Sequence, residues 1–410
     1  MDQVISNGAG VNGRTRRELR SRLRWMHPDA RRVVVVRTLR GFADGFVSIL
    51  LAHHLVTLGF TPLQVGVIVT GTLVGSAALT LLVGLTGVRV GFRTLLLAAS
   101  ALMAATGLGF FAVTALVPLL VIAVVGTLNP SAGDVSVFLP TEQAFLAGHA
   151  TGTARTRLYA FYNVGGNLAG ALGALVSGAI TGRVGFLLYV AVAAVAALVY
   201  RGLPRHEPRP STHTKPLERS RTVVVQLAAL FSLDAAGGGL VIQSLLVVWL
   251  HLKFDFSTTS TATLFFCAGS LAAFSQFLAP RLSRRVGLVR TMVYTHLPAN
   301  CFLVLAALAP HAGIAIGFLL LRSVLSQMDV PARQALVMAA VPSEERAAAA
   351  SVTNVPRSLA SAATPALAGW LLANGNLAAP LVLAGAAKAT YDLLLLWRFR
   401  SITVDHGTTS

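Results

Sequence analysis

Long apolar runs alternate with short polar segments along most of the chain. Runs such as residues 95–113 and 186–200 approach the roughly 20 residues that a helix needs to cross a bilayer. The alternation typical of membrane β-strands is missing, and backbone polar groups in lipid must be satisfied internally, so we expect helices. The pattern predicts spans at residues 33–58, 62–86, 93–113, 115–145, 157–181, 184–203, 223–251, 258–282, 289–309, 312–339, 346–373 and 377–398.

The longest polar connection lies at the centre of the chain and separates these spans into two groups of six. We therefore predict an all-α integral membrane protein with twelve transmembrane helices in two pseudo-symmetric six-helix bundles. The expected organisation is a basic cytoplasmic N-terminal tail at 1–32, an N-terminal bundle at 33–203, a cytoplasmic linker at 204–222, a C-terminal bundle at 223–400 and a cytoplasmic tail at 401–410.

The two groups of spans share a sequence repeat, in which seven positions align without a gap at a constant offset of 191 and five of them carry the same residue. Residues 140–144 (Pro-Thr-Glu-Gln-Ala), Arg155 and Asn163 return as residues 331–335 (Pro-Ala-Arg-Gln-Ala), Arg346 and Asn354. Strongly apolar repeats of this kind are typical of membrane transporters whose substrate site lies between the halves.

Composition supports the membrane assignment, since 55% of residues are hydrophobic and only 12% are charged, against roughly 25% charged in soluble domains. The net charge of +18 could indicate a nucleic-acid partner, but Lys and Arg gather in the N-terminal tail, the central linker and alternate loops. This positive-inside asymmetry predicts the cell inner membrane, both termini cytoplasmic and no nucleic acid. The basic tail is either solvated or leans on anionic membrane lipid.

The residue types that serve as nucleophiles and metal ligands form no pattern of a catalytic or metal site. Cys267 and Cys301 fall inside predicted helices, where inert packing is the expected role. His53, His54 and His296 show no zinc-type spacing, and neither a phosphate-cradling loop nor a serine-nucleophile elbow occurs. We therefore expect no metal, no cofactor and no enzyme activity. The expected partners are a small-molecule substrate and protons or another coupling ion, and we expect a monomer.

The loop after the second span of each half carries a recognisable motif. Residues 84–93 read Gly-Leu-Thr-Gly-Val-Arg-Val-Gly-Phe-Arg, and the positions that matter below are Arg89, Gly91 and Arg93. The second copy of the loop has Arg285 and Gly287 at the positions of Arg89 and Gly91. Together with the six-plus-six arrangement, these loops resemble those of the major facilitator superfamily, and the resemblance covers essentially the whole chain. The acidic position of the family's motif is occupied by Val88 in the first copy and by an arginine in the second.

The resemblance implies that these loops latch the cytoplasmic side closed through charge pairs with neighbouring helices. Glu142, at the cytoplasmic end of the fourth span, is the candidate partner for Arg89 and Arg285. The repeat places Arg333 at the position equivalent to Glu142, so we expect these opposite charges to meet when the inner side closes. The alternative is that Arg89 and Arg285 serve only as topology signals.

Ionisable residues deep in the bilayer cost several kcal/mol by insertion scales, so each is a functional candidate. Asp44 and Asp234 lie near the midplane of the first and seventh spans, and Gln243 follows Asp234 in the same span. Arg40 precedes Asp44 by one helical turn, which permits an ion pair. The pair either only lets the helix insert, or is broken by substrate or proton during transport.

Two further spans carry polar residues at depth. In the fourth span, Asn-Pro-Ser-Ala-Gly-Asp at residues 129–134 predicts either a helix break that exposes Asp134 to a cavity or a simple kink. Arg322 and Arg357 are deep cations of the C-terminal half that suit an anionic or zwitterionic substrate. They are equally able to pair with Asp329 or Asp234. In the last span, Lys388 and Asp392 are one turn apart, and we expect them to pair with each other.

These residues predict a secondary active transporter of a small organic solute that works by alternating access. Proton coupling through Asp44, Asp234 or Asp134 is the expected energy source, and export is favoured only by analogy with the family. The alternatives are a proton-coupled importer or a uniporter of an organic anion. A membrane receptor or enzyme on the same fold is the alternative of another class.

Overall fold

The computed structural model describes residues 26–86, 90–131, 137–150, 152–180, 182–205, 220–276, 278–342 and 345–399. All regular elements within these ranges are helices, as the sequence predicted. The predicted site residues Arg89 and Asp134 lie outside the described residues.

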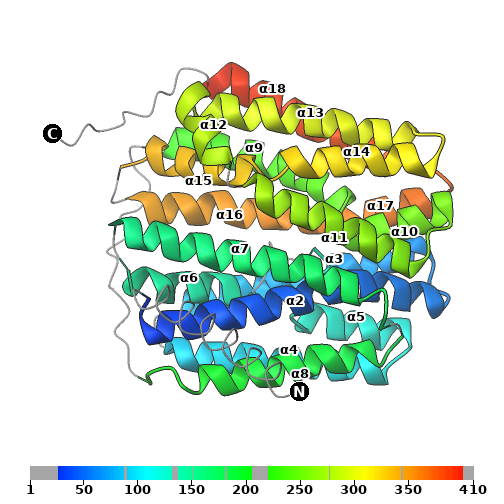
Figure 1. Cartoon of the computed structure of the whole chain (residues 1–410), viewed down its shortest axis with the longest axis horizontal. Helices are drawn as coiled ribbons and strands as arrows, with labels where there is room; N and C mark the ends of the chain where they lie inside the picture. The colour runs from blue at the N-terminus through cyan, green and yellow to red at the C-terminus, as the bar shows by residue number, and fades with distance from the viewer. Residues whose placement is uncertain are drawn as a thin grey trace, which may run out of the picture.

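The N-terminal half consists of the helices up to residue 200, which occupy the lower part of Figure 1. They are α2 (Pro28–Thr57), α3 (Pro62–Thr86), α4 (Phe92–Ala112), α5 (Leu116–Val125), α6 (Phe138–Gly148), α7 (Gly152–Val176) and α8 (Gly185–Tyr200). Below, the end of the bundle where α2 begins is the near end, and the end where α2 finishes is the far end.

The C-terminal half occupies the upper part of Figure 1 and repeats this order with more interruptions. Its helices are α9 (Arg221–Leu240), α10 (Gln243–Phe254), α11 (Thr258–Ser275), α12 (Ala279–Val286), α13 (Leu288–Leu308), α14 (Ala312–Leu325), α15 (Asp329–Ala340), α16 (Arg346–Ala363), α17 (Pro365–Ala373) and α18 (Ala379–Phe399). Consecutive pairs such as α9 and α10 together fill one predicted span.

Five of the described segments are by themselves long and apolar enough to cross a membrane, namely residues 62–83 of α3 and the whole of α4, α9, α13 and α18. Interrupted or charged spans complete the bundle between them. The chain is a multi-pass integral membrane protein.

The predicted interruption of the fourth span is present, because α5 ends at Val125 and α6 begins only at Phe138. Asn129 stabilises the irregular backbone, since its Oδ1 accepts hydrogen bonds from the Ser131 amide at 3.0 Å and the Ser131 hydroxyl at 2.8 Å. Ser244 of α10 donates its hydroxyl to the Pro130 carbonyl at 3.1 Å. The carbonyl freed by the break therefore bonds to the opposite half of the molecule.

Close contacts between the halves gather toward the far end. α3 packs against α17, and α7 packs against α11. A Cβ atom on Gly66 would lie 2.5 Å from the Pro365 carbonyl oxygen, so only glycine allows this approach. Thr258 of α11 and His53 of α2 share a hydrogen bond of 2.9 Å at the same end. The right-hand side of Figure 1 shows α10, α11 and α17 meeting the N-terminal half there.

Gly66→Ala is expected to slow transport severalfold, because the added methyl group would hold α3 and α17 apart and hinder closure of the far end. Gly317→Ala is the matched control, since a Cβ atom at Gly317 of α14 would meet no described atom within 4 Å. Transport into proteoliposomes and accessibility of a cysteine at Thr258 measure the two effects. Equal behaviour of the two variants would show that the Gly66 contact does not limit closure.

Candidate functional site

A cavity of about 320 Å³ lies within the C-terminal half and reaches Ser131 in the break of the N-terminal half. This volume is in the range of small-molecule sites. The cavity is lined by predicted site residues from five helices: Asp234, Gln243, Arg322, Asp329, Arg333 and Arg357. His296 and Lys388, which were not among the predicted site residues, also line it.

Glycines in α9 bring the cavity walls together. A Cβ atom on Gly239 would overlap the Ser361 carbonyl of α16, and one on Gly237 would lie 3.0 Å from the Ala384 carbonyl of α18. The three consecutive glycines at 237–239 therefore let α9 approach α16 and α18 closely. This approach places Asp234, one turn earlier on α9, against side chains of α18.

Asp234 is the centre of a buried charge network. Lys388 Nζ lies 2.6 Å from its Oδ1, and Arg333 Nη1 lies 3.2 Å from its Oδ2. His296 Nε2 is 3.6 Å from Oδ1. Asp329 is 3.6 Å from the same Arg333 nitrogen, one turn along α15. Both carboxylates of the cavity wall are therefore already neutralised by cations of the same wall.

The predicted pairing of Lys388 with Asp392 is wrong. Asp392 faces α13 instead, where His296 Nδ1 lies 3.0 Å from its Oδ1 and Asn300 Nδ2 donates to its Oδ2 at 2.9 Å. Positions four apart on one helix can pair, but the close approach of α9 offers Lys388 a nearer carboxylate. His296 thus joins Asp392 to Asp234 in one continuous polar network.

Arg322 on α14 stands apart from this network. Its side chain is partly accessible because it lines the cavity, yet its Nε atom has no hydrogen-bond partner. Within the described residues it makes neither an ion pair nor a side-chain hydrogen bond. The expected alternative, a structural pair with Asp329 or Asp234, does not occur, because Arg333 and Lys388 take those carboxylates. Arg357 of α16 lines the same cavity.

The N-terminal half contains a second charge cluster, fully buried and away from the cavity. Arg40 Nη1 lies 2.7 Å from Glu142 Oε1, and the two side chains are 1% and 0% exposed. Tyr162 and Tyr200 both donate their hydroxyls to the Glu142 carboxylate. The Arg40 guanidinium also lies 3.7 Å above the Phe138 ring.

This cluster corrects the expected Arg40–Asp44 pair, because Arg40 forms its ion pair across to α6 and not along its own helix. Asp44 is 4% exposed, and its Oδ2 has no hydrogen-bond partner in the part of the chain that the structure describes. The amide nitrogen of Asn129 is likewise without one. Asp44 therefore stays a candidate for coupling, with one carboxylate oxygen that no described group hydrogen-bonds.

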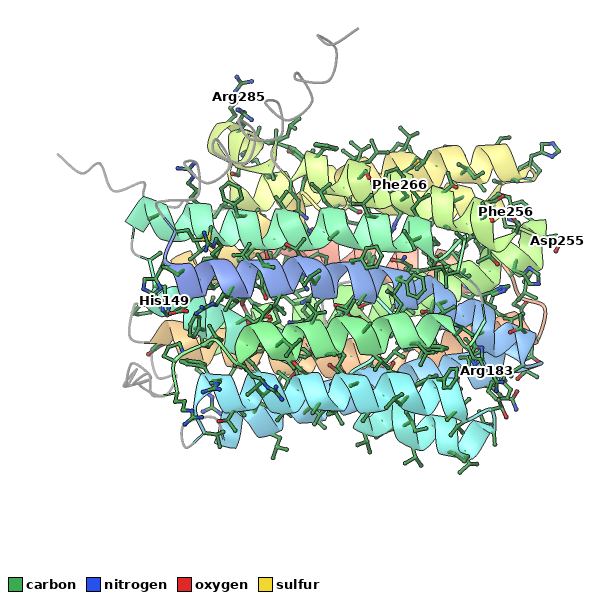
Figure 2. All side chains as sticks on the ribbon, turned by 60° about the horizontal axis from the view of Figure 1, so that its bottom comes forward. His149, Arg183, Asp255, Phe256, Phe266 and Arg285 are labelled. Atoms are coloured by element: carbon green, nitrogen blue, oxygen red, sulfur yellow. The ribbon has the colours of Figure 1, made fainter. Side chains whose placement is uncertain are left out.

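The predicted gating residues lie mostly at the near end. Gly91 caps α4, and Gly287 joins α12 to α13 with a φ of 90°, a conformation that favours glycine. Arg285 projects from α12 outside the bundle in Figure 2, and Arg93 is partly buried at the start of α4. Their latch function stays a prediction.

Glu142 and Arg333 do not meet in this structure. Each is held inside its own half, Glu142 by Arg40 and Arg333 by Asp234. A contact between them would require both of these buried ion pairs to break, and removing a partner from a buried pair costs about 3–5 kcal/mol. The contact that the repeat suggested therefore has a large opposing cost.

Sequence reasoning missed His296, Asn300, Tyr162 and Tyr200 as members of these networks. One signal was available, because a histidine within an apolar span is rare and expensive. The hydroxyls and the amide gave no such signal, because their partners lie on other helices.

Comparison with known proteins identifies the family. The model of the Major Facilitator Superfamily matches residues 33–328. An uncharacterized membrane protein of Saccharomyces cerevisiae, YJR124C, is 25% identical over 89% of this chain and 92% of its own length. It supports the membrane assignment.

Solved transporters share the fold at low sequence identity. A D-xylose-proton symporter is 17% identical with a TM-score of 0.72, covering 92% of this chain and 99% of its own. The human organic anion transporter MFSD10 is 18% identical with a TM-score of 0.67, covering 90% and 100%. The chain therefore belongs to the major facilitator superfamily and is a transporter of a small solute that works by alternating access.

Proposed function

We propose that this transporter moves a small organic anion and is driven by protons. The observation that carries the proposal is Arg322, a guanidinium that lines the cavity and makes no ion pair with any described residue. Leaving a cation at this depth without a partner is costly, and a carboxylate, phosphate or sulfonate of the substrate would supply the partner.

The charge balance of the cavity supports an anion. Its lining contains the cations Arg322, Arg333, Arg357 and Lys388 against the two carboxylates of Asp234 and Asp329. Since the two carboxylates are already paired with Lys388 and Arg333, Arg322 adds positive charge that they do not balance. Gln243, Gln327 and several serines add neutral hydrogen-bonding groups that suit a polar organic solute.

The Asp234 network supports proton coupling. A proton on Asp234 would remove the charge that holds Lys388 and Arg333 together across α18 and α15. His296, which contacts both Asp234 and Asp392, offers a path for that proton through the network. Export remains the proposed direction by analogy with the family, and import and proton-independent uniport are the alternatives.

The substrate class is tested by thermal stabilisation of the purified protein against carboxylates, organic phosphates, sulfonates, neutral sugars and organic cations. A ligand at about 100 times its dissociation constant stabilises by roughly 2.7 kcal/mol. We expect hits among the anions only. Stabilisation by cations alone would contradict the proposal, and transport that is unaffected by a protonophore would favour the uniporter.

Asp234→Asn is expected to abolish proton-driven accumulation while solute exchange across the membrane continues, because the amide keeps the size of the side chain but cannot take up a proton. Counterflow and pH-gradient uptake in proteoliposomes separate the two activities. Asp255→Asn is the matched control, since Asp255 is 96% exposed and asparagine tolerates its positive φ. Full accumulation in Asp234→Asn would remove Asp234 from coupling, and Asp44→Asn would then be the next variant.

A further inference from the structure

A second cluster of ligand-type side chains lies at the near end, far from the cavity. His27 precedes α2, Asp29 lies in its first turn, and His149 follows α6. One ligand atom from each lies within 4.8 Å of the others. The two imidazole rings are 4.9 Å apart between centroids. Figure 2 shows His149 at the end of the bundle opposite Asp255 and Arg183.

We propose that this cluster binds a divalent transition-metal ion such as Zn²⁺, which ties the start of α2 to the end of α6. Two imidazoles and one carboxylate, completed by water, form an open four-coordinate site of the type that zinc adopts. The site is independent of the transport proposal, since none of its residues lines the cavity.

His149 is oriented as a metal ligand. Its Nδ1 lies 2.9 Å from the Phe145 carbonyl, and a carbonyl can only accept, so Nδ1 carries the proton and Nε2 keeps its lone pair. The ring also stacks on Phe145 with centroids 4.3 Å apart. Metal-binding histidines typically donate the N–H of their second ring nitrogen to a carbonyl in this way, which fixes the orientation of the ring and its tautomer.

Asp29 is oriented from the other side. Arg32 Nη1 holds its Oδ1 at 2.5 Å and also donates to the Gly202 carbonyl at 2.6 Å. This leaves Oδ2 toward His27, 3.7 Å from Nδ1. The positive charge of Arg32 beside Asp29 lowers the affinity of the three ligands for a metal ion. We therefore expect the bound ion to exchange readily with ions in solution.

Binding requires only a small closure. Zinc at 2.0–2.2 Å from each ligand places tetrahedral ligand atoms about 3.3 Å apart, so ligand atoms now up to 4.8 Å apart must approach by up to about 1.5 Å. The His27 side chain is 52% exposed and can rotate toward the other two. Because Arg40 and Glu142 join the same two helices deeper in the half, the ion would add a second tie at their near end.

Purified protein without a histidine tag is titrated with zinc chloride by calorimetry and with cobalt chloride by absorption. We expect one equivalent of zinc and a tetrahedral cobalt spectrum. His27→Gln and His149→Gln are each expected to weaken zinc binding at least about tenfold. His251→Gln is the matched control, because His251 is half exposed beside Asp255 at the far end, 3.8 Å away, where no third ligand joins them in the described chain.

The melting temperature without zinc shows whether each variant is folded. If His149→Gln unfolds, His27→Gln still tests zinc binding, because the exposed His27 side chain can be replaced without disturbing the core. The proposal fails if the wild-type protein binds no zinc at 100 µM, a concentration about a hundredfold above a micromolar dissociation constant. It also fails if both variants bind as the wild type does, which would identify adventitious surface binding.

Discussion

Arg322→Gln is expected to weaken binding of an anionic solute by about 10–150-fold and to lower transport at subsaturating solute by the same factor. Hydrogen bonds to charged groups contribute about 1.5–3 kcal/mol, and each 1.4 kcal/mol is a factor of ten. The protein itself loses little on this substitution, because the Arg322 side chain has no ion pair to break among the described residues. The measurement is solute-dependent thermal stabilisation together with initial uptake rate.

Two variants make this result specific. Arg322→Lys keeps the positive charge but loses the planar pair of N–H donors. We therefore expect it to weaken binding of monovalent anionic solutes less than Arg322→Gln does. Arg290→Gln is the matched control, because Arg290 is exposed at the start of α13 and away from the cavity. If Arg322→Gln transports anions at the wild-type rate, Arg322 does not bind substrate, and Arg357 becomes the remaining candidate.

Glu142→Ala is expected to destabilise the N-terminal half by about 3–5 kcal/mol, because it removes the carboxylate that lies 2.7 Å from the Arg40 guanidinium in a buried site. The hydroxyls of Tyr162 and Tyr200 also lose their acceptor. The expected result is poor expression and a lowered midpoint of thermal unfolding in detergent. A variant that is as stable as the wild type but altered in transport would return Glu142 to a gating function.

Replacing Arg40 and Glu142 together removes the ion pair without leaving the Arg40 charge behind, so it shows which of the two losses destabilises the protein. Arg40→Met with Glu142→Met is expected to recover much of the stability, since apolar replacements of a buried ion pair are often neutral or stabilising. Recovery should remain incomplete while the two tyrosine hydroxyls have no acceptor, and adding Tyr162→Phe and Tyr200→Phe should restore more. If the double variant is no more stable than Glu142→Ala, the ion pair is not the cause.

Equivalent positions of the internal repeat carry residues with different hydrogen-bonding roles in the two halves. At one repeated position Glu142 accepts hydrogen bonds, whereas its counterpart Arg333 can only donate. Tyr200 therefore donates to Glu142, while Tyr391, its counterpart at the same offset of 191, has a buried hydroxyl without a partner among the described residues. The N-terminal cluster is closed and satisfied, and the C-terminal one borders the cavity.

The sequence by itself determined the helical membrane fold, because the length of an apolar run and the cost of a charge in lipid are properties of a local segment. The predicted spans and the break near Pro130 agree with the observed helices within a few residues at most ends. The same local signals singled out Asp234, Arg322 and Arg357, which line one cavity. A deep charge is costly wherever it lies, so it can be recognised without knowing its neighbours.

Only the tertiary structure decided the partners of these charges. Lys388 and Asp392 are one turn apart, yet Lys388 pairs with Asp234 because glycines let α9 approach α18. Arg40 likewise reaches Glu142 on α6 and not Asp44 on its own helix. Ion-pair energies depend on distances of a few ångströms. Those distances follow from how helices far apart in sequence rotate and pack against each other. The spacing of residues along the chain does not specify that packing.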